Sequence, residues 1–189
     1  MKVNNLLTVK NRYEFREWLQ ENHEREKECW IFVKRGRPSD DETFWYLDAV
    51  EEALCFGWID STNKIIEGQG RAQRFSPRRA SSHWSELNKE RCRRLEKLGL
   101  MTDAGRAAVD LDEEFVIPED ILEIIESDPV LKKNIESFPP LYVRIRISNI
   151  ERDRKRKDVF EKALNNFIEK SRQGKIYGQW TDYGRLIDY

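Results

Sequence analysis

Apolar residues recur at helical spacing twice in the first third of the chain. Within residues 11–22 and again within residues 43–56 they fall three or four positions apart, with polar residues between them. This spacing places apolar side chains on one face of an α-helix. The pattern therefore predicts two amphipathic helices, the first opened by a cap at Thr8 or Asn11 and the second ended by Gly57.

Between and after these helices the sequence favours β-structure. Residues 29–33 form a short apolar run that leads into a charged turn containing glycine and proline. Residues 58–66 and 71–75 are also β-prone, and the Glu-Gly-Gln-Gly sequence between them suits a hairpin turn. These three segments predict a small antiparallel sheet packed by helices.

The pattern of the second half is helical. Serine, threonine and aspartate caps, together with prolines at helix starts, introduce a series of short amphipathic segments. We expect an α+β fold, with the small antiparallel sheet and its helices in the N-terminal part and an all-helical C-terminal part. The expected helices of the second half lie at residues 82 or 85 to 98, 103–109, 118–125, from 129 onwards, 141–150 and 160–174.

The segment at residues 141–150 fits two structures. Val143, Ile145 and Ile147 alternate with arginines, as in a half-buried strand. The two prolines before the segment, at positions 139 and 140, and its helical surroundings favour a helix. We predict a helix.

The length of 189 residues suits one compact domain with a small appendage. Aromatic residues make up 11% of the chain, which supplies enough large side chains for a core and excludes wholesale disorder. We divide the chain into an α+β domain at residues 1–112, a helical region at residues 113–174 and an aromatic tail at residues 175–189.

Cysteine usage and hydropathy indicate a cytoplasmic protein. The three cysteines, at positions 29, 55 and 92, form no CxxC pair, so neither a disulfide framework nor a zinc site is expected. We expect no export signal, because the N-terminus lacks a long apolar stretch. We also expect no membrane insertion, because no charge-free run approaches the roughly 20 apolar residues of a spanning helix.

Charges nearly cancel over the whole chain but are segregated along it. The net charge is -1, so no global attraction to nucleic acid or membrane is expected. Residues 71–97 hold nine basic and three acidic residues, residues 110–128 hold nine acidic and no basic ones, and residues 142–157 hold seven basic and two acidic ones. These segments either pair with one another inside the molecule or present local patches to a partner.

Several segments together resemble the YdeI/OmdA family, which is labelled bacteriocin-protection, YdeI or OmpD-associated. The resemblance extends from the first helix to about Gly174 and includes PPLY at 139–142 and the basic helix after it. The segments that carry it are EFREWLQENH at 14–23, residues 29–33, AVEEALCFGWID at 49–60, QRFSPRR at 73–79, Trp84-Ser85 with Asn88 and Arg91, and MTDAG at 101–105.

The resemblance implies an α+β N-terminal part, a helical C-terminal part and a stress- or bacteriocin-resistance context. It implies no particular reaction. The chain departs from the family pattern at Asp103, where proline is usual, and at His83, where asparagine is common before the tryptophan. Its tail after Gly174 is additional.

The stretch from Arg74 to Arg79 is the strongest candidate for a binding site. Arg74, Arg78 and Arg79 bring guanidiniums to a strand end that leads to a helix start, an arrangement suited to anions. Trp58 or Trp84 could add a stacking surface, and Asp60 lies close by in the predicted hairpin. In the alternative interpretation, Arg71 or Arg74 forms a structural ion pair with Asp60, and Arg78 and Arg79 are solvated.

Catalytic interpretations have weaker support. Cys55 could act as a nucleophile with His23 or His83 as base, but a free cysteine among apolar residues is usually packing. Glu51 and Glu52 could do acid–base work if buried, although we expect them on the solvated face of their helix. We predict no catalytic residue, no metal site and no cofactor.

The leading hypothesis is a cytoplasmic binding protein for an anionic or phosphate-bearing small molecule. The first alternative is single-stranded nucleic-acid binding by the same loop and residues 142–157, which is possible but not favoured. The second is a small hydrolase or transferase that uses Asp60, Cys55 or His83. The third is a protein-interaction module, with no protein partner identifiable from the sequence.

Overall fold

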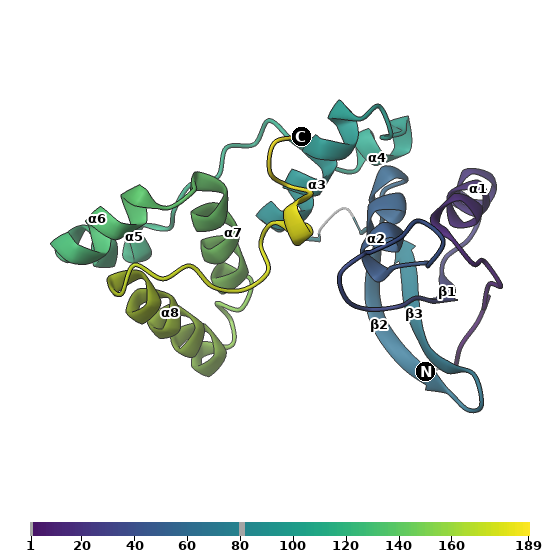
Figure 1. The fold of residues 1–189 in the computed structure, drawn as a ribbon, viewed down its shortest axis with the longest axis horizontal. Helices are drawn as coiled ribbons and strands as arrows, with labels where there is room; N and C mark the ends of the chain where they lie inside the picture. Colours follow the sequence, from purple (N-terminus) through teal and green to yellow (C-terminus); the bar gives the residue numbers. More distant parts are fainter. Residues whose placement is uncertain (1, 80–81) are drawn as a thin grey trace. The chain divides into compact units, whose positions relative to one another are not determined.

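A computed structural model describes residues 2–79 and 82–189 of the chain. The chain divides into two compact units (Figure 1). The first unit consists of Met1–Ser82, Glu90–Leu111 and Asp182–Tyr189, and the second consists of His83–Lys89 and Asp112–Thr181.

The first unit contains the predicted antiparallel sheet. Its strands lie in the order β1-β3-β2, so the hairpin strand β3 is central. The register pairs Trp58 with Pro77 and Asp60 with Phe75, and it shifts at a bulge between Asp60 and Asn63. The strands are β1 (Cys29–Phe32), β2 (Trp58–Ile66) and β3 (Gly70–Pro77).

Two helices, α1 (Arg12–Asn22) and α2 (Tyr46–Cys55), pack against this sheet, as the apolar spacing predicts. The ring of Phe15 on α1 lies 5.5 Å from that of Phe75 on β3. Trp58 on β2 is 1% exposed and meets Trp18 on α1 edge to face at 5.8 Å. Large aromatic side chains therefore form the core between helix and sheet.

The short helix α4 (Asp103–Ala107) packs against the C-terminal end of α2. Thr102 caps α4 by accepting a hydrogen bond from the N–H of Gly105, and its hydroxyl donates to the carbonyl of Cys55 at 2.5 Å. A Cβ on Gly105 would overlap that same carbonyl, so only glycine permits this approach. The helix before α4, α3, spans Glu86–Lys97 and is capped by Ser85.

The second unit has only helical regular structure among its described residues, which confirms the predicted all-helical C-terminal part. Asp128 caps α6 through the N–H groups of Val130 and Leu131. Tyr142 and Phe167, both 0% exposed, lie in its core. Its helices are α5 (Glu119–Ser127), α6 (Pro129–Ser137), α7 (Pro140–Glu151) and α8 (Lys157–Arg172).

The ambiguous segment at residues 141–150 is a helix, α7. Its buried residues include Tyr142, Val143, Ile145 and Ile147, which occupy more than one face of the helix. Because burial is not confined to one stripe, helical periodicity is weak in its sequence. After α8 the chain forms only a short 3-10 turn, Asp182–Gly184.

In the described part of the chain, none of the helices combines the length and the apolar character needed to cross a membrane.

Candidate functional site

Arg74 is held in a structural ion pair. Its Nε donates to Glu28 Oε2 at 2.6 Å, and its Nη1 donates to the hydroxyls of Ser61 and Ser76. The Arg74 guanidinium lowers the pKa of Glu28. Residues alternate across a strand, so Arg74 faces away from the side of the sheet that carries Phe75 and its cross-strand partner Asp60.

The predicted ion pair of Asp60 with Arg71 or Arg74 is wrong. Asp60 Oδ2 instead accepts a hydrogen bond of 2.6 Å from the hydroxyl of Tyr46, the first residue of α2. Burial and the neighbouring carboxylate raise the pKa of Tyr46, which keeps the phenol protonated and able to donate.

The remaining predicted binding residues do not share one environment. Arg78 is half-buried, donates to the carbonyl of Ser82 at 3.4 Å and interacts electrostatically with Asp60, and burial lowers its pKa. Arg79 is exposed. Trp58 is buried and donates its indole N–H to the carbonyl of His23, so it offers no stacking surface, contrary to the prediction. Trp84 belongs to the second unit.

The thiol of Cys55 is a core group. It is 0% exposed, and burial raises its pKa to about 12. A nucleophilic cysteine needs a lowered pKa and access to substrate, so the geometry opposes that role for Cys55. Of the two bases considered for it, His83 is an exposed residue of the second unit, and the ring of His23 contacts the carbonyl of Leu19 through Nδ1.

A different pair of arginines shares a hollow on the first unit. Arg35, in the loop after β1, and Arg71, on β3, line a cavity of about 190 Å³ together with Val33 and Gln73. Arg35 Nη2 donates to Gln73 Oε1 at 2.8 Å, and Arg71 Nη1 donates to Asn63 Oδ1 at 2.6 Å. Both partners are neutral amides.

Packing fixes the inner wall of this hollow. Gln73 is 2% exposed, and its amide nitrogen donates to the carbonyl of Thr62 at 3.1 Å, which leaves its oxygen turned to Arg35. The Arg35 guanidinium lies over the ring of Tyr46, 4.2 Å from the ring centre. Stacking and hydrogen bonding together hold this exposed cation in place.

No carboxylate of the described chain forms an ion pair with Arg35 or Arg71. Most other arginines of the first unit contact carboxylates, as Arg74 does with Glu28 and Arg106 does with Glu96. The hollow therefore carries two positive charges that the protein does not neutralise at close range. In the sequence, the loop that contains Arg35 shows only the signals of a turn, so this pair of arginines is not expected from it.

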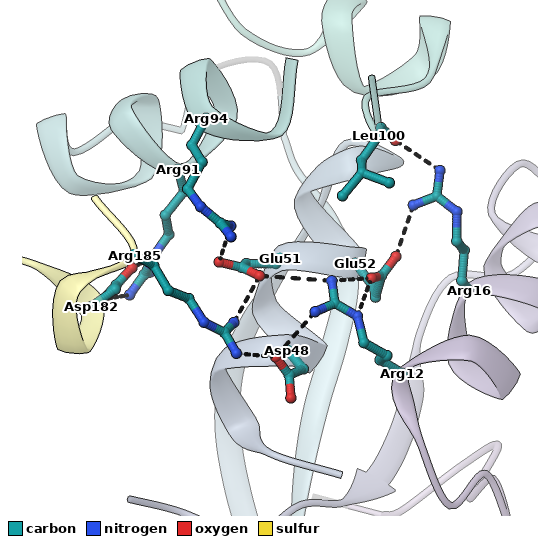
Figure 2. A network of polar contacts seen from close by, with 10 residues as sticks. All are labelled: Arg12, Arg16, Asp48, Glu51, Glu52, Arg91, Arg94, Leu100, Asp182 and Arg185. Carbon is teal, nitrogen blue, oxygen red and sulfur yellow. Dashed lines mark hydrogen bonds and ion pairs between the residues drawn. The ribbon is translucent and has the colours of Figure 1, made fainter. Parts of the chain in front are cut away.

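The first unit also holds a charged network on α2 (Figure 2). Asp48, Glu51 and Glu52 are 4%, 1% and 3% exposed. The prediction that Glu51 and Glu52 occupy a solvated helix face is therefore wrong. Helical apolar spacing could not reveal this, because it does not show what covers the opposite face.

Each of these carboxylates meets arginines from other segments. Arg12 on α1 donates to Glu52 at 2.5 and 2.9 Å and to Asp48 at 3.3 Å, and Arg16 donates to Glu52 at 2.8 Å. Buried carboxylates need such partners, because an unpaired buried charge is strongly unfavourable.

Glu51 has both oxygens occupied. Oε1 lies 2.9 Å from Arg94 on α3, and Oε2 lies 2.9 Å from Arg185 near the C-terminus. Burial raises the pKa of Glu51 although these guanidiniums oppose the shift. The burial required for acid–base work is present, but both oxygens are engaged in ion pairs, so the contacts favour a structural role.

Within residues 2–79 and 82–189, histidine, cysteine, aspartate and glutamate form no group of three that could hold a metal ion.

A family model described as a domain of unknown function (DUF8412) matches residues 7–108, more than half of the 189-residue chain. No curated protein and no solved structure matches the chain.

Proposed function

Because the chain belongs to the family of the domain of unknown function DUF8412, whose description gives no activity, we propose a function from its own residues. We propose that the protein binds a small anionic ligand in the hollow between Arg35 and Arg71. This keeps the class of ligand expected from the sequence and moves its site away from Arg74, whose guanidinium is already paired with Glu28.

One observation carries the proposal: two guanidiniums without a carboxylate partner line the same hollow. A guanidinium presents a planar fork of N–H donors that matches carboxylate and phosphate oxygens. A bound anion would supply the missing negative charge, and Gln73 keeps Arg35 oriented before binding. The volume of about 190 Å³ suits a small anionic group, since pockets for drug-sized ligands measure roughly 300–1,000 Å³.

The cellular context is part of the same proposal. Cys29, Cys55 and Cys92 are free and buried, which suits a reducing compartment, and on that basis we place the protein in the cytoplasm. The resemblance to the YdeI/OmdA family adds a stress- or bacteriocin-resistance context.

Calorimetric titration at low ionic strength, with inorganic phosphate and a small dicarboxylate as probes, tests the proposal. We expect binding by the native chain and a loss of about tenfold or more in affinity for Arg35→Gln and for Arg71→Gln, because each removes a charge-assisted contact of about 1.5–3 kcal/mol. Arg37→Gln is the matched control, an exposed arginine of the same loop outside the hollow.

The variant with Arg78→Ala and Arg79→Ala tests the anion-binding site that the sequence predicts at the end of β3. If this variant loses binding while Arg35→Gln and Arg71→Gln retain it, the site lies at the end of β3 and our assignment is wrong. Failure of both probes to bind the native chain contradicts anion binding itself.

Single-stranded nucleic-acid binding is a second candidate, supported by a hollow on the second unit. This hollow measures about 530 Å³ and is lined by His83, Glu151, Arg152, Arg154 and Lys155. Four of these residues belong to the basic segment at residues 142–157, which the sequence suggests for nucleic-acid binding. Binding of an oligonucleotide that weakens steeply with salt, and that Lys155→Gln reduces, would support this function.

A further inference from the structure

The C-terminal segment, residues 182–189, folds against α2 and the part of α3 in the first unit. Asp182 forms a two-point ion pair with Arg91 on α3, with contacts of 2.6 and 2.9 Å. Arg185 reaches two carboxylates on α2, Asp48 at 2.7 Å and Glu51 at 2.9 Å (Figure 2). The acidic and the basic residue of the segment thus meet one arginine and two carboxylates of the domain.

Two further side chains complete the contact. Leu186 is 3% exposed, so the segment also buries an apolar group. The hydroxyl of Tyr189 donates to Glu90 Oε1 at 2.9 Å, and Lys97 lies over the Tyr189 ring, 5.5 Å from its centre. The segment is therefore anchored by four residues of different chemistry: Asp182, Arg185, Leu186 and Tyr189.

The receiving surface and its occupant come from different parts of the chain. The family model at residues 7–108 contains every receiving residue, from Asp48 and Glu51 to Arg91 and Lys97, and none of the segment. Residues 173–181 contain no helix or strand, so the segment is joined to α8 by irregular chain. The domain thus presents a surface, and a separate short peptide fills it.

We propose that this surface of α2 and α3 is a peptide-recognition site, and that residues 182–189 of the same chain are its separable occupant. In the recognised peptide, an aspartate binds Arg91, and an arginine three positions later binds Asp48 and Glu51. The leucine next to that arginine is buried, and a tyrosine three positions after the leucine donates to Glu90. A peptide with the two charges exchanged places like charges together, which opposes binding.

Removal of the segment takes opposite charges away from the surface, which favours renewed binding of the segment. Arg91 loses a two-point carboxylate partner, and Glu51 retains Arg94 but loses Arg185. The loss of an opposite charge is unfavourable for groups as buried as Arg91 and Glu51, so the emptied surface attracts a segment with the same charge order.

The test uses the full chain with Asp182→Asn and Arg185→Gln, which removes both charges of its own segment while keeping polar side chains at the two positions. A fluorescein-labelled peptide with the native sequence of residues 180–189 is titrated with this variant and with the native chain, and fluorescence anisotropy is recorded. We expect saturable binding by the variant. Binding by the native chain should be at least tenfold weaker, because its own segment competes at an effective concentration of about millimolar.

Two controls distinguish recognition from non-specific attraction. A peptide with aspartate and arginine exchanged at positions 182 and 185 should bind at least tenfold more weakly than the native sequence. The same loss is expected when Arg91→Gln is added to the variant chain. Equal binding of native and exchanged peptides, or no binding to a variant that melts cooperatively, overturns the proposal.

Hydrogen exchange of the native chain gives a second measurement that does not depend on the variant folding. A separable occupant opens locally, so the amides of Arg185 and Ile187 should exchange at least tenfold faster than buried amides of α2. Exchange of both groups at the same rate, governed by global unfolding, contradicts a separable segment.

Discussion

Glu51 on α2 and Arg185 near the C-terminus form an ion pair of 2.9 Å, although 134 positions separate them in the chain. Glu51 also pairs with Arg94, and its neighbours Asp48 and Glu52 pair with Arg12. The network joins α1, α2, α3 and the C-terminal segment through charges rather than apolar contacts. Its stability depends on every buried carboxylate keeping a partner.

Truncating one arginine of this network should strongly destabilise the first unit. Arg12→Ala removes the contacts to Glu52 and Asp48 and leaves two buried carboxylates with fewer partners. We expect a loss of about 3 kcal/mol in the free energy of unfolding. Urea unfolding followed by circular dichroism measures the change.

Arg106→Ala is the matched control for Arg12→Ala. Arg106 pairs with Glu96 and Asp103, but its side chain is 45% exposed. Exposed ion pairs contribute little, so we expect a much smaller change in the free energy of unfolding than for Arg12→Ala. Equal losses in the two variants would show that burial does not set the importance of the α2 network.

Gly105→Ala should destabilise the junction of α2 and α4. Alanine favours a helix over glycine by about 1 kcal/mol, so propensity alone predicts stabilisation. The added methyl overlaps the Cys55 carbonyl, and this overlap should cost about 1–3 kcal/mol. Net stabilisation in thermal unfolding would contradict the close approach of α4 to α2.

The three thiols should be inert in the native protein. Burial raises the pKa of Cys55 and of Cys92 to about 12, and it also raises the pKa of Cys29. Because the thiolate is the reactive form, these cysteines should react slowly with Ellman's reagent at pH 8 and rapidly after denaturation. Rapid reaction of Cys55 in the folded protein would support a nucleophilic role for it. The variant Cys55→Ser should leave anion binding unchanged.

The Arg74–Glu28 pair should contribute to stability at neutral pH and be lost in acid. Its folded-state carboxyl pKa lies below the unfolded value, so the contribution is present above about pH 4.3 and disappears as pH falls through the folded pKa. Glu28→Gln should lower stability by about 1 kcal/mol at pH 7 and have little effect at pH 2. Urea unfolding at both pH values checks this, and an equal loss at both contradicts it.

Local sequence patterns predict most of the fold. Apolar spacing and caps locate α1 and α2, the Thr102 cap locates α4, and the apolar run at residues 29–33 locates β1. Each of these signals arises from contacts within a few residues or from one buried face. Segments with such signals are the ones that sequence analysis finds.

The site depends on contacts that sequence spacing does not encode. In the structural alternative, Arg71 or Arg74 pairs with Asp60, but Arg74 lies on the other face of the sheet and pairs with Glu28, while Asp60 contacts Tyr46. The exposed position of Glu51 was predicted from its helix alone, whereas Arg94 and Arg185 from distant segments cover it. Three arginines at a predicted strand end suggest anion binding in the sequence, whereas only the folded chain brings Arg35 close to Gln73 on β3.

The all-round burial of α7 has a consequence for the unfolded chain. Val143, Ile145 and Ile147 are hidden in the native helix, but in an unfolded second unit they form an alternating β-prone run. Such runs promote aggregation through intermolecular strand pairing. Arg144 and Arg146 lie within the run and oppose its stacking by charge repulsion, a protection that salt weakens. Thermal precipitation of this protein should therefore increase with ionic strength.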